Sequence, residues 1–121
     1  MKPSEIIMLA AQQSGINPAA ALKATSMKIR SEGLKPIRDK ESLMLFKPLT
    51  QGVAKVYFIS ADSHLNMLSA FQTFKKFLKR DAIHHVFMAN QNNLILSALD
   101  HSGIHPMPSN VPAYPIVARV E

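Results

Sequence analysis

Four amide side chains follow one another between the apolar run "AIHHVFMA" and the stretch "LILSALDHSG", at Asn90, Gln91, Asn92 and Asn93. Asparagine is a preferred helix N-cap, because its side-chain oxygen accepts a hydrogen bond from a backbone N–H group that the first helical turn leaves unpaired. A single cap accounts for one of the four amides. The others are expected either to face solvent or to contact a partner at an interface.

The five histidines include two pairs that raise the question of a metal site. His84 and His85 are adjacent on a predicted strand, so their side chains point to opposite faces and cannot bind one ion together. His101 and His105 have helical spacing, but Gly103 is expected to end the helix between them. The chain has no cysteine, which excludes disulfides, thiolate zinc sites and a cysteine nucleophile. We predict no metal site.

The length of 121 residues suits one compact domain, and a hydrophobic content of 47% is enough for a core. The net charge of +6 favours an anionic neighbour: nucleic acid, a phosphorylated ligand or an acidic protein surface. Aromatic residues make up 7% and tryptophan is absent, so base stacking on single strands is not indicated. The N-terminal sequence resembles an amphipathic helix more than a signal peptide, and no apolar run is long enough to span a bilayer. We expect a soluble protein without membrane contact.

Residues 1–34 predict a pair of helices. Ser4 can cap a first helix over "EIIMLAAQQS", with Gly15 just past its end. Asn17 followed by Pro18 is a strong start signal for a second helix, which should stop at Gly33. The basic residues on and after this second helix predict a solvated face.

The middle of the chain predicts a hairpin and then an amphipathic helix. The runs 42–48 and 53–60 are rich in β-forming residues and are separated by a short loop, which is typical of two antiparallel strands. Residues 63–80 show helical periodicity, and Asp62 or Ser63 can cap this helix. One side carries its core residues, Met67, Ala70, Phe71, Phe74 and Leu78, and the other its basic residues, Lys75, Lys76, Lys79 and Arg80.

The remaining residues predict a strand at 83–89, a helix from about Asn92 to Gly103, an irregular proline-rich loop and a last strand, "YPIVARV". Strands 53–60 and 83–89 flank a helix and should therefore be parallel. The fold class is thus α/β: one domain, residues 1–121, with a mixed central sheet and helices on both faces. Residues 1–34 form the helical pair, and residues 41–121 form the sheet with two crossover helices.

The strand, the asparagine Asn90, the helix and the pair Gly103-Ile104 resemble the C-terminal half of the GNAT (acyl-CoA N-acyltransferase) fold. In that family the asparagine contacts the coenzyme A arm where two parallel strands splay apart. The order of elements from residue 42 onward is similar too. The resemblance implies a GNAT-like fold whose first strand is lost or truncated, because this chain opens with a helix.

The chain departs from the family at the turn that binds the coenzyme pyrophosphate. There the family has a glycine-rich loop whose backbone N–H groups hold the phosphates. The matching stretch "ISADSHLNML" has no glycine, and Asp62 places a negative charge where the phosphates would lie. We therefore predict no cofactor and no catalytic residue. If the chain is active, the resemblance implies acetyl-CoA held by Asn90, Ser60 and Ser63, with Tyr114 as the acid. Otherwise Tyr114 is a packed aromatic.

A GNAT-like domain without its phosphate turn is similar to small internal virion and head-assembly proteins of short-tailed bacteriophages. The stretches "VYFISADSHLNMLSAFQTFKKFLKR" and "HHVFMANQNNLILSALDHSGI" carry this resemblance. It implies a non-enzymatic role in the virion or the host cytoplasm, through contacts with capsid, portal or internal core proteins and with DNA packed nearby. The basic residues Lys75, Lys76, Lys79 and Arg80 would then contact acidic surfaces. The alternatives are an N-acetyltransferase using acetyl-CoA and a basic nucleic-acid-binding accessory protein.

Overall fold

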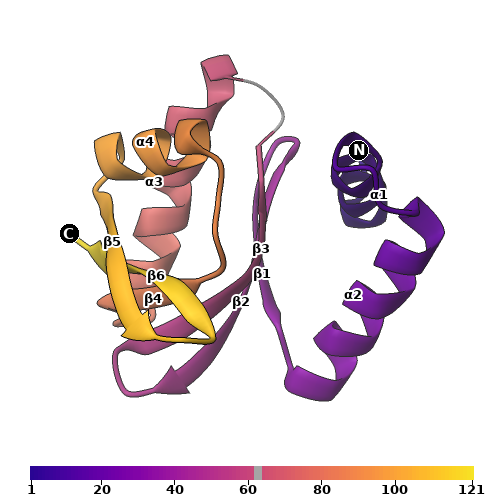
Figure 1. The fold of residues 1–121 in the computed structure, drawn as a ribbon. Helices are drawn as coiled ribbons and strands as arrows, with labels where there is room; N and C mark the ends of the chain where they lie inside the picture. Colours follow the sequence, from indigo (N-terminus) through magenta and orange to yellow (C-terminus); the bar gives the residue numbers. More distant parts are fainter. Residues whose placement is uncertain (62–63) are drawn as a thin grey trace.

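Two pairs of helices enclose a six-stranded mixed sheet in the computed structural model, which describes residues 1–61 and 64–121. The strand order is β1-β2-β3-β4-β6-β5. Figure 1 shows α1 and α2 on one face of the sheet and α3 and α4 on the other, which confirms the prediction of helices on both faces. The elements are α1 (Pro3–Gln13), α2 (Pro18–Glu32), β1 (Lys35–Asp39), β2 (Ser42–Thr50), β3 (Val53–Ser60), α3 (His64–Arg80), β4 (His85–Met88), α4 (Asn93–His101), β5 (Ile104–Val111) and β6 (Tyr114–Val120).

The first helix begins two residues before the predicted position. Lys2, not Ser4, is the N-cap residue of α1, and the backbone N–H of Lys2 donates to the Glu5 carboxylate at 3.1 Å. The reason is Pro3, whose fixed φ angle and missing N–H suit the first helical position. The start of α2 is as predicted, because the Asn17 side chain accepts from the Ala20 N–H at 3.0 Å.

A strand that the sequence pattern did not predict, β1, follows α2. It pairs antiparallel with β2, Ile37 lying opposite Met44, and Ile37 is its one buried residue. Proline and charged residues surround that isoleucine, which is typical of a short edge strand and hides the alternation that would reveal it. Among the described residues α1 is the first element, followed by α2 and β1.

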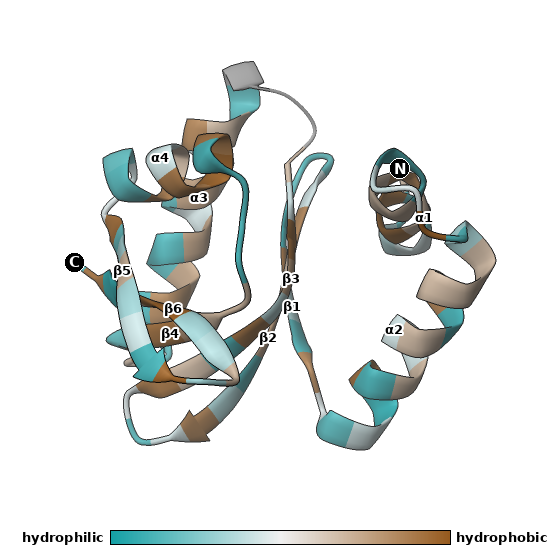
Figure 2. Cartoon of the chain, viewed as in Figure 1, coloured by the Kyte–Doolittle hydropathy of each residue, from teal (hydrophilic) through white to brown (hydrophobic). Residues whose placement is uncertain are grey.

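The hairpin of β2 and β3 and the parallel pairing of β3 with β4 confirm the sequence prediction. Figure 2 shows hydrophobic residues along β2, β3 and β4 at the centre of the molecule. On the α3 side, Phe71, Phe74 and Leu78 have no exposed surface, and Met67 and Ala70 are buried with them, so the predicted stripe is core. On the α1 side, Ile6 and Ile7 pack against buried leucines of β2.

The proline-rich segment after α4 is a strand rather than the irregular loop that its composition predicts. Pro106 and Pro108 lie in β5, opposite Ala118 and Ile116 of β6. Because β5 is the outer edge of the sheet, a proline can lie there without breaking an interior ladder of hydrogen bonds. Within the described ranges, no helix is both long and apolar enough to cross a membrane.

Candidate functional site

Strands β3 and β4 pair for only three residues and then separate. β3 continues to Ser60 after its pairing with β4 ends at Lys55. After Val56, which still pairs with Phe46, the ladder with β2 skips Tyr57, so β3 contains a β-bulge. A bulge bends its strand and increases the local twist, which accounts for the separation. The paired positions are Val53 with His85, Ala54 with Val86 and Lys55 with Phe87.

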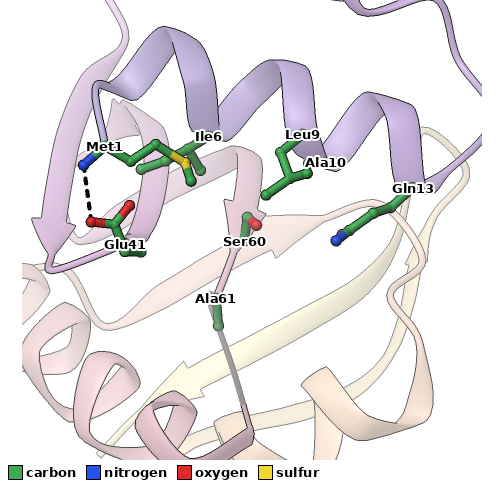
Figure 3. Close-up of a pocket in the computed structure, with 8 residues that line it drawn as sticks. All are labelled: Met1, Ile6, Leu9, Ala10, Gln13, Glu41, Ser60 and Ala61. Atoms are coloured by element: carbon green, nitrogen blue, oxygen red, sulfur yellow. Dashed lines mark hydrogen bonds and ion pairs between the residues drawn. The ribbon is translucent and has the colours of Figure 1, made fainter.

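A groove of about 450 Å³ opens where the two strands separate, and we call it the splay groove. This volume lies in the range of small-ligand sites. It brings together Ser60 and Asn90, which the GNAT resemblance places at one site. Figure 3 shows the neighbouring pocket under α1, which shares Ala10, Gln13, Ser60 and Ala61 with the splay groove and is also lined by Met1, Ile6, Leu9 and Glu41. The lining residues are Ala10, Gln13, Ser14, Ile59, Ser60, Ala61, Met67, Asn90, Gln91, Asn92, Leu94 and Ile95.

The amides at 90–93 have different roles. Asn92 caps α4, its side-chain oxygen accepting from the Ile95 N–H at 2.8 Å. Gln91 donates from its side chain to the Ala89 carbonyl at 3.3 Å. The Asn90 side chain makes no hydrogen bond with any described residue and lines the splay groove. One amide therefore caps the helix, and Asn90 is available to a ligand.

The splay groove is uncharged over its described residues. Its lining contains no side chain that could act as an acid or a base near neutral pH. It also contains no lysine or arginine, although the chain has 14 of them. The predicted cap residues Asp62 and Ser63 lie outside the described residues. The described side chains of the groove can form hydrogen bonds and apolar contacts.

Tyr114 lies away from this groove. Its ring centre is 5.9 Å from that of Phe87, and the Lys55 ammonium nitrogen lies 5.3 Å from the Tyr114 ring centre. A lysine over an aromatic face is a cation–π contact, which helps to hold both side chains in place. The surroundings of Tyr114 are therefore those of a packed aromatic, and it is absent from the groove lining that the structure describes.

The basic residues of α3 do not all share one surface. Lys76, Lys79 and Arg80 are exposed, and the Arg80 guanidinium lies 4.5 Å from the Phe77 ring centre. Together with Thr73, the residues Lys76, Phe77 and Arg80 line a hollow of about 460 Å³. Lys75 is half-buried, and its ammonium nitrogen would be 2.7 Å from a Cβ atom added to Gly103. Lys75 therefore lies against the end of α4 rather than on the exposed face.

An ion-paired histidine, His105, lies near the start of β5, just after α4. The two ring nitrogens of His105 are 2.7 Å from an Asp100 oxygen and 2.5 Å from a Glu121 oxygen. The hydrogen bonds to Glu121 and then to Asp100 raise the pKa of His105, and the bond from His105 lowers the pKa of Glu121. No group of three potential metal ligands converges among the described residues.

No protein-family model matches the chain, and no curated protein matches it. The fold does have a match: the crystal structure of Tetrahymena GCN5 superimposes with a TM-score of 0.60. That comparison covers 98% of this chain and 86% of the other at 11% identity. The chain has a GNAT-like fold. An identity this low shows the fold alone.

Proposed function

We propose that this chain is a non-enzymatic interaction protein built on a GNAT-like scaffold. The observation that carries the proposal is the uncharged lining of the splay groove over the described residues. Acyl transfer to an amine needs a base for the nucleophile and an acid for the leaving thiolate. Coenzyme A also needs positive charge or converging backbone N–H groups at its phosphates. The described lining offers no acid, base or cation, and this supports a role other than acyl transfer.

Within this role we propose a function in virion or head assembly of a short-tailed bacteriophage. The support is the sequence resemblance: a strand ending in serine and aspartate, a basic helix, a strand followed by Asn90 and a helix closed by Gly103. The partners would be capsid, portal or internal core proteins. Lys76, Lys79 and Arg80 expose positive charge around the hollow on α3, which complements an acidic protein surface.

Calorimetric titration with acetyl-CoA at low salt tests the proposal. We expect no heat of binding, because the described residues of the groove provide no charge to offset the phosphates. Binding in the micromolar range would contradict the proposal and favour an enzyme.

The N-acetyltransferase alternative has one observation in its favour, since Ser60 and Asn90 line the same groove at the end of splayed strands. A transfer assay with acetyl-CoA and mixed amine acceptors separates the two functions. The proposal predicts no acetylation above the uncatalysed background. If acetylation were observed and Tyr114→Phe reduced it, the alternative would be correct and Tyr114 would be its acid.

A further inference from the structure

The outer edges of the sheet are built to resist the addition of another strand. β1 contains Pro36 and carries charges at Lys35, Arg38 and Asp39. β5, at the other end of the sheet, contains Pro106 and Pro108. Prolines and charges on edge strands are the usual means of preventing edge-to-edge association, because proline lacks the N–H donor and charge opposes burial.

The sheet has a third edge, which faces the splay groove and has no such protection. It is formed by residues 57–60 of β3, whose sequence "YFIS" has neither proline nor charge. Tyrosine, phenylalanine and isoleucine favour strands. On its other side this segment is held by β2, through the pairs Leu45 with Phe58, Met44 with Ile59 and Leu43 with Ser60.

Residues 57–60 of β3 have no neighbouring strand on the groove side among the described residues. The ladder with β4 ends at Lys55, so in the described part of the chain no strand pairs with β3 beyond that point on this side. Backbone N–H and C=O groups need hydrogen-bonding partners, and an extended polypeptide supplies both at the right spacing. Four residues at about 3.3 Å each fit a partner segment of roughly four or five residues.

We propose that an extended segment of a partner protein binds in the splay groove and adds as a strand to the edge of β3 formed by residues 57–60. This proposal rests on the proposed interaction function and names its site and the form of its partner. The bulge at Tyr57 separates β3 from β4 and so creates the space for the added strand.

The groove lining also defines the side chains of the partner. Gln13, Ser60 and Asn90 offer hydrogen bonds to uncharged polar groups. Leu94, which lines the groove and is 47% exposed, adds apolar surface. Because the described lining carries no charge, a segment of apolar, amide and hydroxyl side chains fits best. An acidic segment would instead bind at the basic hollow on α3.

Selection of peptides from an unbiased display library on the intact chain tests this proposal. We expect uncharged peptides rich in β-forming residues. N-methylation of the selected peptide removes one backbone donor at a time and leaves the side chains in place. Every second position should lose about tenfold in affinity, because alternate N–H groups of an added strand face β3.

Two variants test the location of the bound peptide. Gln13→Trp and Asn90→Trp place a large side chain in the groove from positions that are exposed, and each should weaken peptide binding by tenfold or more. Met27→Trp is the matched control, since Met27 on α2 is 59% exposed and lies outside the groove lining. Circular dichroism melting should show that all three variants remain folded.

Several results would overturn the proposal, and they separate it from the proposed function. Failure to select any peptide would contradict the added strand. An N-methyl series in which the loss of affinity does not alternate along the peptide would contradict it as well. Peptides that are acidic and lost in Lys76→Glu would place the interface on α3 and leave the interaction function intact. Displacement of the peptide by acetyl-CoA would contradict both proposals. Concentration-dependent dimerisation abolished by Gln13→Trp would make a second copy of the chain the occupant instead of a foreign partner.

Discussion

His105 is the residue whose charge state has the clearest structural consequence. It lies within hydrogen-bonding distance of Asp100 and Glu121, and these contacts raise its pKa above the ordinary value. A raised pKa means that the folded state favours the charged imidazole, so the stabilisation is fully present below about pH 6.5 and is lost as the pH rises through the raised pKa. Glu121 stays ionised across this window, because its pKa is lowered.

We therefore expect the melting temperature of the wild type to fall between about pH 6 and about pH 9 by more than that of His105→Gln. His101→Gln, which removes an exposed histidine next to the same cluster, is the control and should follow the wild-type profile. Parallel pH profiles for the wild type and His105→Gln would show that the ion pairs do not contribute to stability.

Gly103 ends α4 in a conformation that favours glycine, with a φ angle of +93°. An added Cβ would also lie 2.7 Å from the Lys75 ammonium nitrogen. We expect Gly103→Ala to cost about 1–2 kcal/mol in the free energy of unfolding, measured by urea denaturation. Gly33→Ala is the matched control, because Gly33 has a φ angle of +66° and nothing within 4 Å of its Cβ position. Equal losses in the two variants would mean that Lys75 moves aside without cost.

Capping rules predicted several helix ends. Asn17, Gly33 and the start of α4 at Asn92 followed from capping rules alone. The predicted N-cap at Ser4 is wrong because Pro3 occupies the first helical position, so the helix begins two residues earlier. Lys75 is half-buried although its helical position looks like that of Lys79, because the end of α4 packs there, and a contact between distant segments leaves no trace in local spacing.

At the scale of elements, α3 depends on its phenylalanine stripe. Phe74 has no exposed surface and lies 5.5 Å from Phe71, ring centre to ring centre. Phe74→Ala should lower the free energy of unfolding by about 3–5 kcal/mol, because it removes contacts and leaves a cavity. Phe77→Ala, on the same helix but only half-buried, should cost much less. Similar losses in chemical denaturation would contradict this assignment of the core.

The cap of α4 gives an independent test of the amide cluster. Asn92→Ala should cost about 1 kcal/mol, because it leaves the Ile95 N–H without its acceptor, and Asn92→Ser should restore most of the loss. Asn90→Ala should leave stability nearly unchanged, since the Asn90 side chain has no hydrogen bond with the described residues. A large loss in Asn90→Ala would mean that Asn90 supports the fold rather than a ligand.

The elements that the sequence did not reveal are β1 and β5, the two edge strands. Neither strand shows the alternation of apolar and polar residues that identifies a strand, and both contain proline. In a sequence pattern proline indicates a loop, whereas in the folded sheet it is tolerated on an edge strand. The splay of β3 and β4 depends on the bulge at Tyr57, which follows from the register with β2 and from no local pattern. Ser60 and Asn90 were predicted at one site by resemblance, but Gln13 could not be, because it reaches the groove through the docking of α1.

For the whole molecule, the net charge of +6 and the exposed basic residues of α3 predict weak, sequence-independent binding to DNA. Duplex DNA should bind at low salt and be released as salt rises. Lys76→Glu should weaken binding to all DNA sequences by a similar factor. Tight binding that resists salt would instead support the nucleic-acid-binding alternative. Gln72 is exposed on the same helix, so Gln72→Glu is the control. It measures how much of the lost DNA affinity comes from an added negative charge alone.

The proposed interaction function and the proposed strand addition both require a splay groove that accepts polypeptide rather than coenzyme A. The most direct measurement is a titration of the isotope-labelled chain with millimolar acetyl-CoA, followed by backbone amide NMR. We predict unchanged amide signals along residues 59–61 and 90–92, which line the splay groove. Saturable shifts of those signals would show that the coenzyme binds between the separated strands and would contradict the account.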